Sequence, residues 1–424
     1  MADDDLKRQW LSFSNSDQKI LCDATHGKLW DALVVPGTLA TYYLKGVGGY
    51  VLASRRPYVI DPRTPLLQRS EMSPRPIPRA SHETLAKIHN ERVGEIWAEG
   101  KEVPREIWTP ELWRQTVTNV LNFQSSFQDT AADNINKYEE MLKDSGMTLN
   151  VPVHGPDRLV PPYWAVRGSQ DQWWDLSRAA IEQAAEEHGP TNIMPVLCLD
   201  TNAPTNHFSE LIAELPPGLD RIFCWKGSWN ETDATPDDIL GWLAAIDNAA
   251  NANIEIVNMY GGALSVLMTG AGLAGVNHGV GYSESRDERR LSQTGAPPMR
   301  YYMPRLRQFL TVPRAQQALD VLREPGDDWG CHCAVCDGLT TVVGLKTEEL
   351  KRHFLLCRRA EFSASGQDPQ AAIADLASDA VSLQERFGED DESPGTTLAQ
   401  RGRVLEGWAS LLPPHNSSPH STSY

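Results

Sequence analysis

The centre of the chain reads Ile193-Met-Pro-Val-Leu-Cys-Leu-Asp200, then Arg221-Ile-Phe-Cys-Trp225, then Ile254-Glu-Ile-Val-Asn-Met259. Apolar runs of about 4–8 residues that are rich in β-branched and aromatic side chains are typical of buried strands. The intervals between them hold two amphipathic stretches, Asn206–Leu215 and Pro236–Ala252. This regular exchange of strand and helix predicts β/α units with parallel strands.

The same alternation extends outward in both directions from the centre. A further amphipathic helix is expected over Gln172–His188, and no G-x-G-x-x-G follows the first expected strand, which disfavours a dinucleotide-binding sheet. We therefore predict a (β/α)8 TIM-like barrel with a helical insertion and a C-terminal zinc-binding subdomain. The remaining expected strands are Lys19–Asp23, Tyr50–Ala53 with Tyr58–Asp61, Leu159–Val166 and Ala274–Gly279.

Two regions interrupt or follow the β/α pattern. A Pro- and Arg-rich loop leads into helical stretches at Glu83–Glu99 and Pro110–Gly146, and the end of the chain is rich in Ser, Pro and His, which predicts a disordered tail. The expected domains are the first barrel strands (1–68), a helical insertion (69–150), the rest of the barrel (151–325), a zinc-binding and helical subdomain (326–387), and an acidic linker with a short helix and disordered tail (388–424).

A cysteine-rich segment, Cys331-His-Cys333-Ala-Val-Cys336, predicts a metal site. Thiolate and imidazole are the ligands of tetrahedral structural zinc, and four of the seven cysteines fall within 27 positions. A helix starting near Thr347 would bring His353 to the fourth corner, and Cys357, one turn further on, is the alternative fourth ligand. The competing interpretation is a set of ordinary buried thiols. A site closed by four protein ligands is structural, so we expect a Zn²⁺ ion that takes no part in catalysis.

Composition limits the class of protein. The 424 residues suffice for one large domain with appendages, and 41% hydrophobic with 22% charged residues is ordinary for a globular protein. No apolar run approaches the ~20 residues that a membrane span needs, and the N-terminus shows no secretory signal. Cys22, Cys198 and Cys224 are isolated, which favours a reducing compartment. We therefore expect a cytoplasmic protein without a membrane partner.

Charge is unevenly distributed. A formal net charge of −17 argues against a protein that coats nucleic acid non-specifically, yet residues 283–314 hold seven arginines against three acids. Tyr301, Tyr302 and Phe309 are interleaved with them, so this segment predicts a footprint for a phosphate backbone. The alternative is that these arginines pair with acidic side chains elsewhere in the chain.

Polar residues stand at the ends of the expected strands, where a barrel places its active face. Asp23, Asp61 and Asp200 each end one strand, and converging carboxylates serve as nucleophile or general base. The alternative is that each aspartate caps the next helix or turn. Gly261-Gly262, which carries no Cβ, would let the backbone approach a planar ligand.

These motifs together resemble the tRNA-guanine transglycosylase superfamily, and within it the branch that inserts 7-deazaguanine derivatives into DNA. The sequence departs from that family where it has Asn277 and His278 in place of an aspartate, and in the short interval between Cys336 and His353. The segments that carry the resemblance are the Cys331–Cys336 knuckle with His353, Gly261-Gly262-Ala263-Leu264, Val59-Ile-Asp61-Pro, and the loop from Gly275 to Arg286.

The resemblance implies a base exchange: a carboxylate attacks C1′ of a guanosine, guanine leaves, and a 7-deazapurine takes its place. Asp61 would act on the purine, Asp200 or Glu284 would be the nucleophile, and His278 is a candidate base. The implied partners are DNA, less readily RNA, a purine or 7-deazapurine base, and accessory protein subunits. Substrate contacts are expected from Asp23, Trp225, Tyr260, Gly261, Gly262, Tyr282, Arg286, Arg305 and Arg307.

Two other functions compete with base exchange. The missing aspartate favours a non-catalytic paralogue that keeps the barrel and zinc and binds nucleic acid or a partner protein. An unrelated barrel enzyme, for example a hydrolase using Asp23, His26 and Asp61, would use the zinc knuckle for interaction only. The three hypotheses differ in whether carboxylates converge and whether the basic segment borders them.

Overall fold

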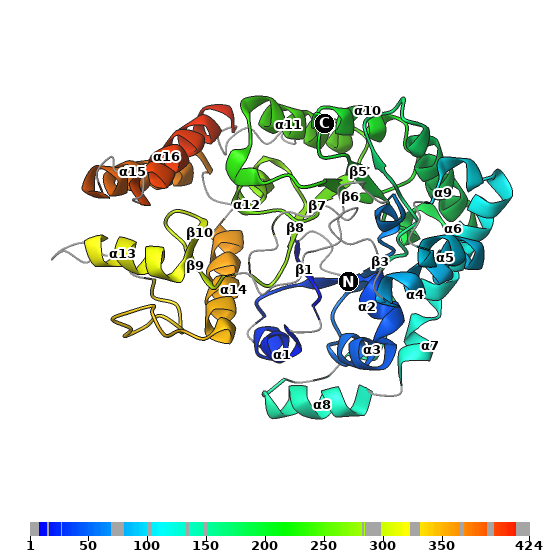
Figure 1. Cartoon of the computed structure of the whole chain (residues 1–424), viewed down its shortest axis with the longest axis horizontal. Coiled ribbons are helices and arrows are strands. Elements are labelled where there is room, and N and C mark those ends of the chain that lie inside the picture. Colours follow the sequence, from blue (N-terminus) through cyan, green and yellow to red (C-terminus); the bar gives the residue numbers. More distant parts are fainter. Residues whose placement is uncertain are drawn as a thin grey trace, which may run out of the picture.

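Eight parallel strands form the centre of the molecule, a computed structural model (Figure 1). Their order is β3-β2-β1-β8-β7-β6-β5-β4. The first and last of these eight strands, β1 and β8, are therefore neighbours in the middle of the curled sheet, and β3 and β4 are its two ends. This arrangement is consistent with the predicted (β/α)8 barrel. The structure describes residues 8–14, 17–26, 28–68, 80–99, 103–132, 135–147, 149, 151–281, 284, 298–322, 331–364, 369–387 and 394–412.

The strands and helices alternate along the chain. The strands are β1 (Arg8–Ser12), β2 (Ala32–Pro36), β3 (Tyr58–Asp61), β4 (Ala165–Val166), β5 (Val196–Leu199), β6 (Arg221–Lys226), β7 (Glu255–Asn258) and β8 (Gly275–His278). The helices among them are α1 (Gln18–His26), α2 (Gly37–Tyr42), α3 (Leu44–Ala53), α4 (Ala80–His89), α5 (Glu91–Ala98), α6 (Pro110–Ser125), α7 (Phe127–Ala131), α8 (Ile135–Asp144), α9 (Gln172–His188), α10 (His207–Ala213), α11 (Pro236–Asn251) and α12 (Ala263–Met268). Short 3₁₀ turns occupy η2 (Thr64–Leu67), η3 (Arg105–Ile107), η5 (Pro190–Asn192), η6 (Glu231–Asp233) and η7 (Thr269–Ala271).

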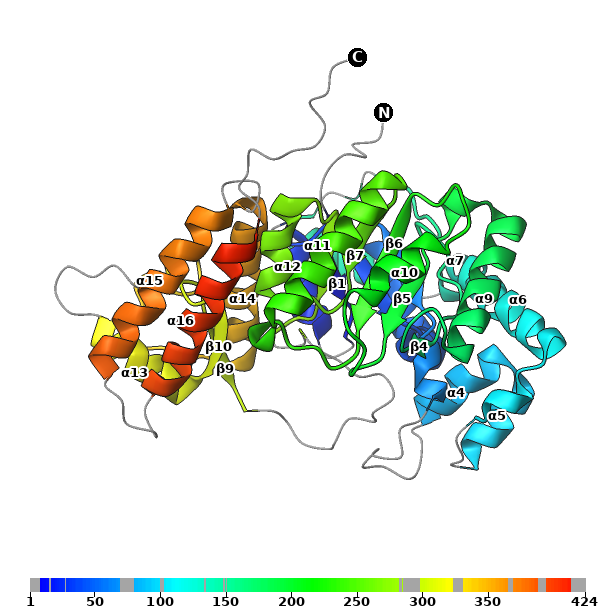
Figure 2. The same ribbon diagram turned by 90° about the horizontal axis from the view of Figure 1, so that it is seen from above.

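A second group of elements follows the barrel and lies beside it (Figures 1 and 2). It consists of an antiparallel hairpin, β9 (Arg300–Met303) and β10 (Gln308–Thr311), and four helices. These are α13 (Val312–Leu322), α14 (Thr347–Ala364), α15 (Pro369–Phe387) and α16 (Pro394–Leu411). Among the described residues, no helix is long and apolar enough to cross a bilayer.

Two of the expected strands are wrong. Lys19–Asp23 lies in α1 and Tyr50–Ala53 ends α3. The first two strands are instead Arg8–Ser12 and Ala32–Pro36, which the sequence patterns did not predict. The physical reason is that α3 is buried from Val47 to Ala53, and a short apolar run in a buried helix has the same composition as a strand.

The strands and helices around the centre of the chain are confirmed in type, including the helix over Gln172–His188. The expected strand at Leu159–Val166 is shorter than predicted, because only Ala165 and Val166 belong to β4. The expected disordered tail from Pro413 onward and the Pro- and Arg-rich loop over 71–79 lie outside the described residues.

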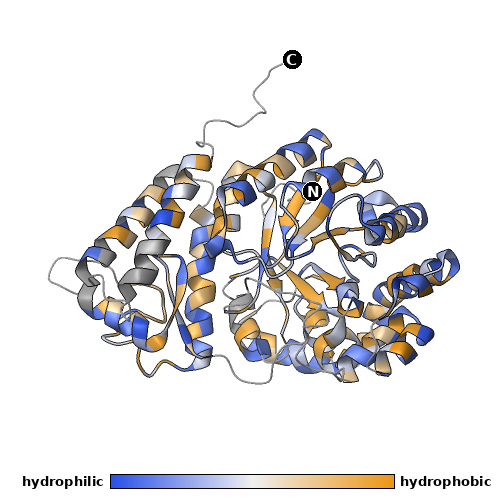
Figure 3. Ribbon diagram, turned by 45° about the horizontal axis from the view of Figure 1, so that its top comes forward, coloured by the Kyte–Doolittle hydropathy of each residue, from blue (hydrophilic) through white to orange (hydrophobic). Residues whose placement is uncertain are grey.

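The central strands are largely hydrophobic (Figure 3). One buried cluster fills the barrel interior with side chains from alternate positions of β1 to β7. Val59 of β3 and Cys198 of β5 are among the interior residues. Because side chains alternate with a period of two, Asp61 and Asp200 fall on the same interior side, at the carboxyl ends of their strands. The full interior cluster is Trp10, Ala32, Val34, Val59, Val160, Tyr163, Ala165, Met194, Val196, Cys198, Phe223, Trp225, Val257, Met259 and Tyr260.

A side chain connects β3 and β4, the two ends of the strand order. Gln68, just after β3, donates from Nε2 to the Ala165 carbonyl at 3.0 Å and accepts from the Ala165 amide at 2.8 Å. One amide side chain therefore makes the two hydrogen bonds that a neighbouring strand would make. No ladder between β3 and β4 is found within the part of the chain that the structure describes.

Helices α10 and α11 approach closely at Gly241. An alanine Cβ there would lie 2.2 Å from Thr205 Oγ1 and 2.6 Å from the Asn206 amide nitrogen. Because Asn206 contributes backbone, Gly241→Ala should destabilise the fold by about 1–3 kcal/mol despite the better helix propensity of alanine. The measurement is urea unfolding. The matched control is Gly46→Ala in α3, whose nearest contact would be Tyr138 Oη at 3.9 Å and which should stabilise the fold.

Candidate metal centre and carboxylate site

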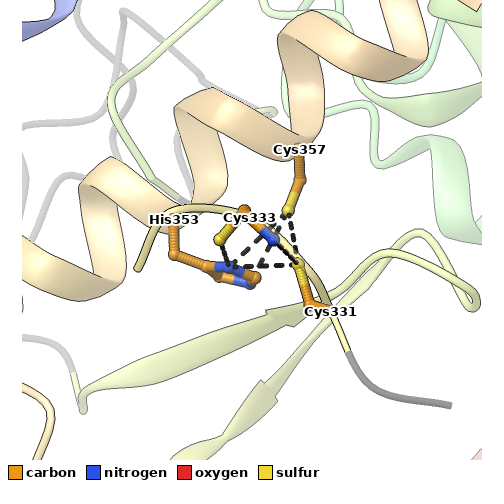
Figure 4. A group of neighbouring side chains, drawn as sticks. All are labelled: Cys331, Cys333, His353 and Cys357. Atoms are coloured by element: carbon orange, nitrogen blue, oxygen red, sulfur yellow. Dashed lines mark hydrogen bonds between the residues drawn. The ribbon is translucent and has the colours of Figure 1, made fainter. Parts of the chain in front are cut away.

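Four metal-ligating side chains, those of Cys331, Cys333, His353 and Cys357, converge between the cysteine knuckle and α14 (Figure 4). The Cys336 thiol lies beside them. Cys331, Cys333 and Cys336 lie in the turn before the helix, while His353 and Cys357 lie one helical turn apart on α14. His353 Nδ1 is 3.3 Å from Cys333 Sγ and from Cys336 Sγ. It is 3.6 Å from Cys357 Sγ and 3.8 Å from Cys331 Sγ. Of the predicted ligands, Cys331, Cys333 and His353 form a mutually close group with Cys357, the alternative fourth ligand. Cys336 is not in that group, although its Sγ also lies near His353 Nδ1.

Strand β9 fixes the orientation of the histidine. His353 Nε2 lies 2.7 Å from the Tyr302 carbonyl oxygen, so Nε2–H donates to it and Nδ1 keeps a lone pair facing the thiols. The Tyr301 ring stacks on the imidazole at 4.3 Å with an interplanar angle of 12°. The Tyr301 hydroxyl lies 3.3 Å from Cys336 Sγ. Metal-ligating histidines usually donate their other ring N–H to a carbonyl or carboxylate in this way, which fixes the ring's orientation.

The spacing of the donor atoms fits a four-coordinate ion. In a tetrahedron with metal–sulfur and metal–nitrogen distances of about 2.3 and 2.0 Å, neighbouring donor atoms lie roughly 3.5–3.8 Å apart. Cys331 Sγ and Cys357 Sγ are 3.6 Å apart. The donor atoms of Cys331, Cys333, His353 and Cys357 all lie within 4.8 Å of one another. The cluster can therefore bind a metal ion.

A pair of carboxylates lies at the carboxyl ends of β6 to β8. Glu231 begins η6 after β6, and Glu284 follows β8. A Cβ on Gly262, in the turn after β7, would lie 3.0 Å from Oε2 of each glutamate. The two oxygens are therefore no more than twice that distance apart, and the missing side chain at Gly262 leaves room for both.

The two glutamates have different surroundings. Glu231 is buried and accepts hydrogen bonds from the Ser265 amide at 3.1 Å, from the Ser265 hydroxyl and from Asn258 Nδ2 at 3.5 Å. The Glu284 side chain is 21% exposed and pairs with Arg358 of α14. Glu231 is thus fixed in the protein interior, whereas Glu284 keeps access to solvent.

Burial raises the pKa of Glu284 from 4.5 to about 7. The Arg358 cation opposes this shift, and the charges of Glu231 and Glu361 add to it. A carboxyl group with a pKa near neutrality exchanges its proton readily at physiological pH, as general acids and bases do. Glu284 is among the residues predicted from the sequence, whereas Glu231 and Arg358 are not, although Glu231 stands only five residues after the end of β6.

Asp61 lies at the end of β3 and is 1% exposed. Its Oδ1 accepts from the Tyr163 hydroxyl at 2.8 Å and from the Arg63 amide at 2.9 Å. The Tyr163 ring lies 6.5 Å from Trp225, which lies 5.1 Å from Tyr260. These side chains form a continuous layer inside the carboxyl end of the barrel. The predicted contact residues Trp225 and Tyr260 are buried within it.

Three non-glycine residues at this edge have left-handed backbone. Arg63, Ser228 and Tyr260 have φ values of 51°, 53° and 57°. Each lies two positions beyond the end of its strand, β3, β6 or β7. Such a conformation costs roughly 1–3 kcal/mol and is concentrated at functional sites. Three of the seven non-glycine residues with left-handed backbone in the described part of the chain therefore lie at the carboxyl edge of the barrel.

The other predicted catalytic residues have protein partners. Asp200 is buried, and its Oδ2 lies 3.9 Å from Arg167 Nε. His278 Nδ1 donates to the Gly279 carbonyl at 2.8 Å, and Nε2 lies 2.8 Å from Gln9 Nε2. Burial lowers the pKa of His278 to about 3, and the Arg358 charge lowers it further. His278 is thus held as a neutral ring between two fixed partners.

The predicted basic footprint is only partly described. Arg305 makes two hydrogen bonds to Asp379, at 2.7 and 2.6 Å, as the alternative interpretation expected. Tyr301 and Tyr302 are buried rather than available to bases, and Arg307 adopts left-handed backbone. Tyr282, Arg286 and the side chain of Asp23 lie outside the described residues. A nucleic-acid partner stays a prediction.

Comparisons with known proteins find no matching family model and no matching curated protein. One similar solved structure is an HpcH/Hpal aldolase/citrate lyase family protein from Burkholderia cenocepacia J2315, with 10% identity, 65% of this chain and 89% of that chain covered, and a TM-score of 0.30. Haloferax volcanii malate synthase matches as a lead(II) complex (13% identity, TM-score 0.33) and as a pyruvate/acetyl-CoA ternary complex (12%, 0.35). Each covers 95% of this chain and 99% of the other. At these scores the likeness carries no conclusion about activity.

The expected membership of the tRNA-guanine transglycosylase superfamily is wrong. The structures that match are an aldolase/citrate lyase family protein and malate synthases, and no family model supports the resemblance. Guanine exchange, insertion of 7-deazaguanine and the non-catalytic nucleic-acid-binding alternative lose their basis with it. The motif that suggested the family is a short metal knuckle, which can occur beside unrelated barrels.

Proposed function

We propose that the chain is a barrel enzyme that hydrolyses an uncharged or cationic substrate, with Glu284 as its general acid and base. The observation that carries this proposal is a partly exposed carboxyl group with a pKa near 7 at the carboxyl edge of the strands. Barrel enzymes place their active sites at that edge. The neighbouring carboxylate of Glu231 disfavours anionic substrates.

One residue, Glu284, can carry out both proton transfers of the hydrolysis. Ionised Glu284 takes a proton from a water molecule as its oxygen attacks the substrate, and then gives that proton to the leaving group. Arg358 stabilises the carboxylate whenever it is ionised. Glu231 does not touch the substrate in this scheme. It acts as a positioning residue whose charge keeps the pKa of Glu284 high.

Glu284→Gln tests the proposal. A panel of nitrophenyl esters, nitrophenyl glycosides and nitroanilides would be offered to the full chain. We expect turnover of at least one class, and a loss of about 10²–10⁴-fold in Glu284→Gln because the proton carrier is gone. Glu348→Gln, an exposed partner of Lys19, is the control and should keep full activity. Equal turnover by Glu284→Gln, or no turnover of any class by the native chain, would show that the hydrolase proposal is wrong.

The pH profile should depend on Glu231. Because the ionised form of Glu284 is needed first, kcat/KM should rise with pH through about 7. Glu231→Gln removes a negative charge and so lowers the pKa of Glu284, which moves this rise to lower pH. The remaining charged groups around it, Arg358 and Glu361 from α14, are unchanged. The measurement is the pH dependence of kcat/KM for both proteins, and an unshifted midpoint would contradict the role of Glu231.

We propose further that the cysteine–histidine cluster holds a structural zinc ion in a C-terminal subdomain. Sulfur and nitrogen donors at tetrahedral spacing support zinc over ions that prefer oxygen ligands. A cytoplasmic location remains part of the proposal. All seven cysteines are free of disulfides, which suits a reducing compartment.

A further inference from the structure

The cluster contains five donors, one more than a structural zinc ion binds. All four thiols lie within 3.8 Å of the same nitrogen, His353 Nδ1. Cys336 comes from the knuckle, where its amide donates to the Cys333 carbonyl at 2.9 Å. Cys357 comes from α14. The two thiols therefore reach the centre from different elements, and each is placed independently of the other.

Both thiols have a partner whether or not they bind metal. The Tyr301 hydroxyl, 3.3 Å from Cys336 Sγ, donates to a metal-bound thiolate and accepts from a free thiol. Cys357 Sγ, 3.6 Å from Cys331 Sγ, can donate its S–H to that neighbouring thiolate when it is not a ligand. Neither arrangement leaves a buried sulfur without a partner, so neither carries the cost of an unsatisfied thiol.

We infer that Cys331, Cys333 and His353 form a shared triangle of ligands, and that either Cys336 or Cys357 completes the tetrahedron. This inference rests on the proposed zinc site. Occupancy by Cys336 gives three ligands from the knuckle and one from α14. Occupancy by Cys357 gives two from each, so the ion then holds the helix to the knuckle at two points.

The inference predicts an either-or pattern of zinc retention. Full-length native chain and the variants Cys336→Ser, Cys357→Ser, the double variant and Cys333→Ser would be loaded with zinc and dialysed against a mild chelator. Zinc per chain is then measured by elemental analysis. We expect about one ion in the native chain and in each of Cys336→Ser and Cys357→Ser, because the shared triangle and one of the two alternative thiols remain. The double variant and Cys333→Ser should lose most of their zinc. Because Cys336 and Cys357 share a single position, each of these variants keeps only three of the four ligands.

Cobalt substitution gives a second readout that is independent of activity. The intensity of sulfur-to-cobalt charge-transfer absorption scales with the number of bound thiolates. It should be the same in the native chain and in both single variants, and lower in any double variant that binds cobalt. Far-UV circular dichroism of each single variant establishes that it folds, so the decisive comparison does not depend on the double variant.

Several results would overturn the inference. Loss of zinc from Cys336→Ser alone would assign the fourth position to Cys336, and loss from Cys357→Ser alone would assign it to Cys357. Retention in the double variant would show that neither thiol is needed. A native chain without zinc would instead refute the proposed zinc site itself, which distinguishes the two failures.

Discussion

Arg358→Met is expected to lower the free energy of unfolding by about 2–4 kcal/mol, because it leaves the carboxylates of Glu361 and the partly exposed Glu284 without their cation. The Arg358 side chain is 1% exposed and pairs with Glu284 and, at 3.1 Å, with Glu361. Its guanidinium also lies 5.2 Å from the Tyr302 ring centre and 5.3 Å from that of Phe354. Methionine fills a similar volume, so the loss reports charge rather than packing.

The neighbouring residue supplies the control. Arg359 pairs with Asp31 at 2.8 Å, but both side chains are more than a quarter exposed. Arg359→Met should therefore cost less than about 1 kcal/mol. Urea unfolding of both variants at pH 8, where Glu284 is mostly ionised, makes the comparison. Equal losses would mean that the buried pairs contribute no more than a surface pair.

Removal of the metal is expected to have a comparably large effect, confined to one part of the molecule. Apparent binding energies of structural zinc reach about 10–16 kcal/mol in small domains, and most of that energy is folding energy. Without the ion, the three thiols of the knuckle lose the bonds that would hold them around His353. We therefore expect α14 and the β9–β10 hairpin to lose protection when a strong chelator is added.

Hydrogen exchange measured with and without the chelator tests this expectation. Amides of α14 and β9 should exchange much faster in the stripped protein, while β6 and β7, in the barrel, should keep their protection and serve as the internal control. Cys333→Ser should reproduce the effect without chelator. Unchanged exchange in α14 would show that the cluster contributes little to folding.

The sequence predicted those elements whose signals are local. The helix over Gln172–His188 and the strands around Val196 and Arg221 have strong periodicity and match the structure. The first two strands were missed because β2 is buried at every position, which removes the alternation that marks a strand. The metal ligands were found because most of them lie within a few residues of one another.

The carboxylate site had no such signal. Glu231, Glu284 and Arg358 come from three segments far apart in the chain, and only the closed order of strands brings their loops together. The raised pKa of Glu284 depends on burial by these neighbours, which no single stretch of sequence reveals. The family resemblance failed for a related reason, since a metal knuckle reports a small local structure and not the chemistry of a distant site.

The Gln68 bridge between β3 and β4 has a consequence for how the barrel is held shut. Every other junction in the strand order is a backbone ladder. At this one, three separate contacts join β3 to β4 and the segment before it: the Gln68 amide on Ala165, the Tyr163 hydroxyl on Asp61, and the Asp157 amide on the Tyr58 carbonyl. A side-chain hydrogen bond can break and form again without a change in strand register. Within the described residues, the ring of strands therefore has one junction without a ladder, between β3 and β4. Five helices, α4 to α8, lie between these two strands in the chain. We therefore expect changes in the length of that helical segment to disturb this junction first, while the other strands keep their alignment.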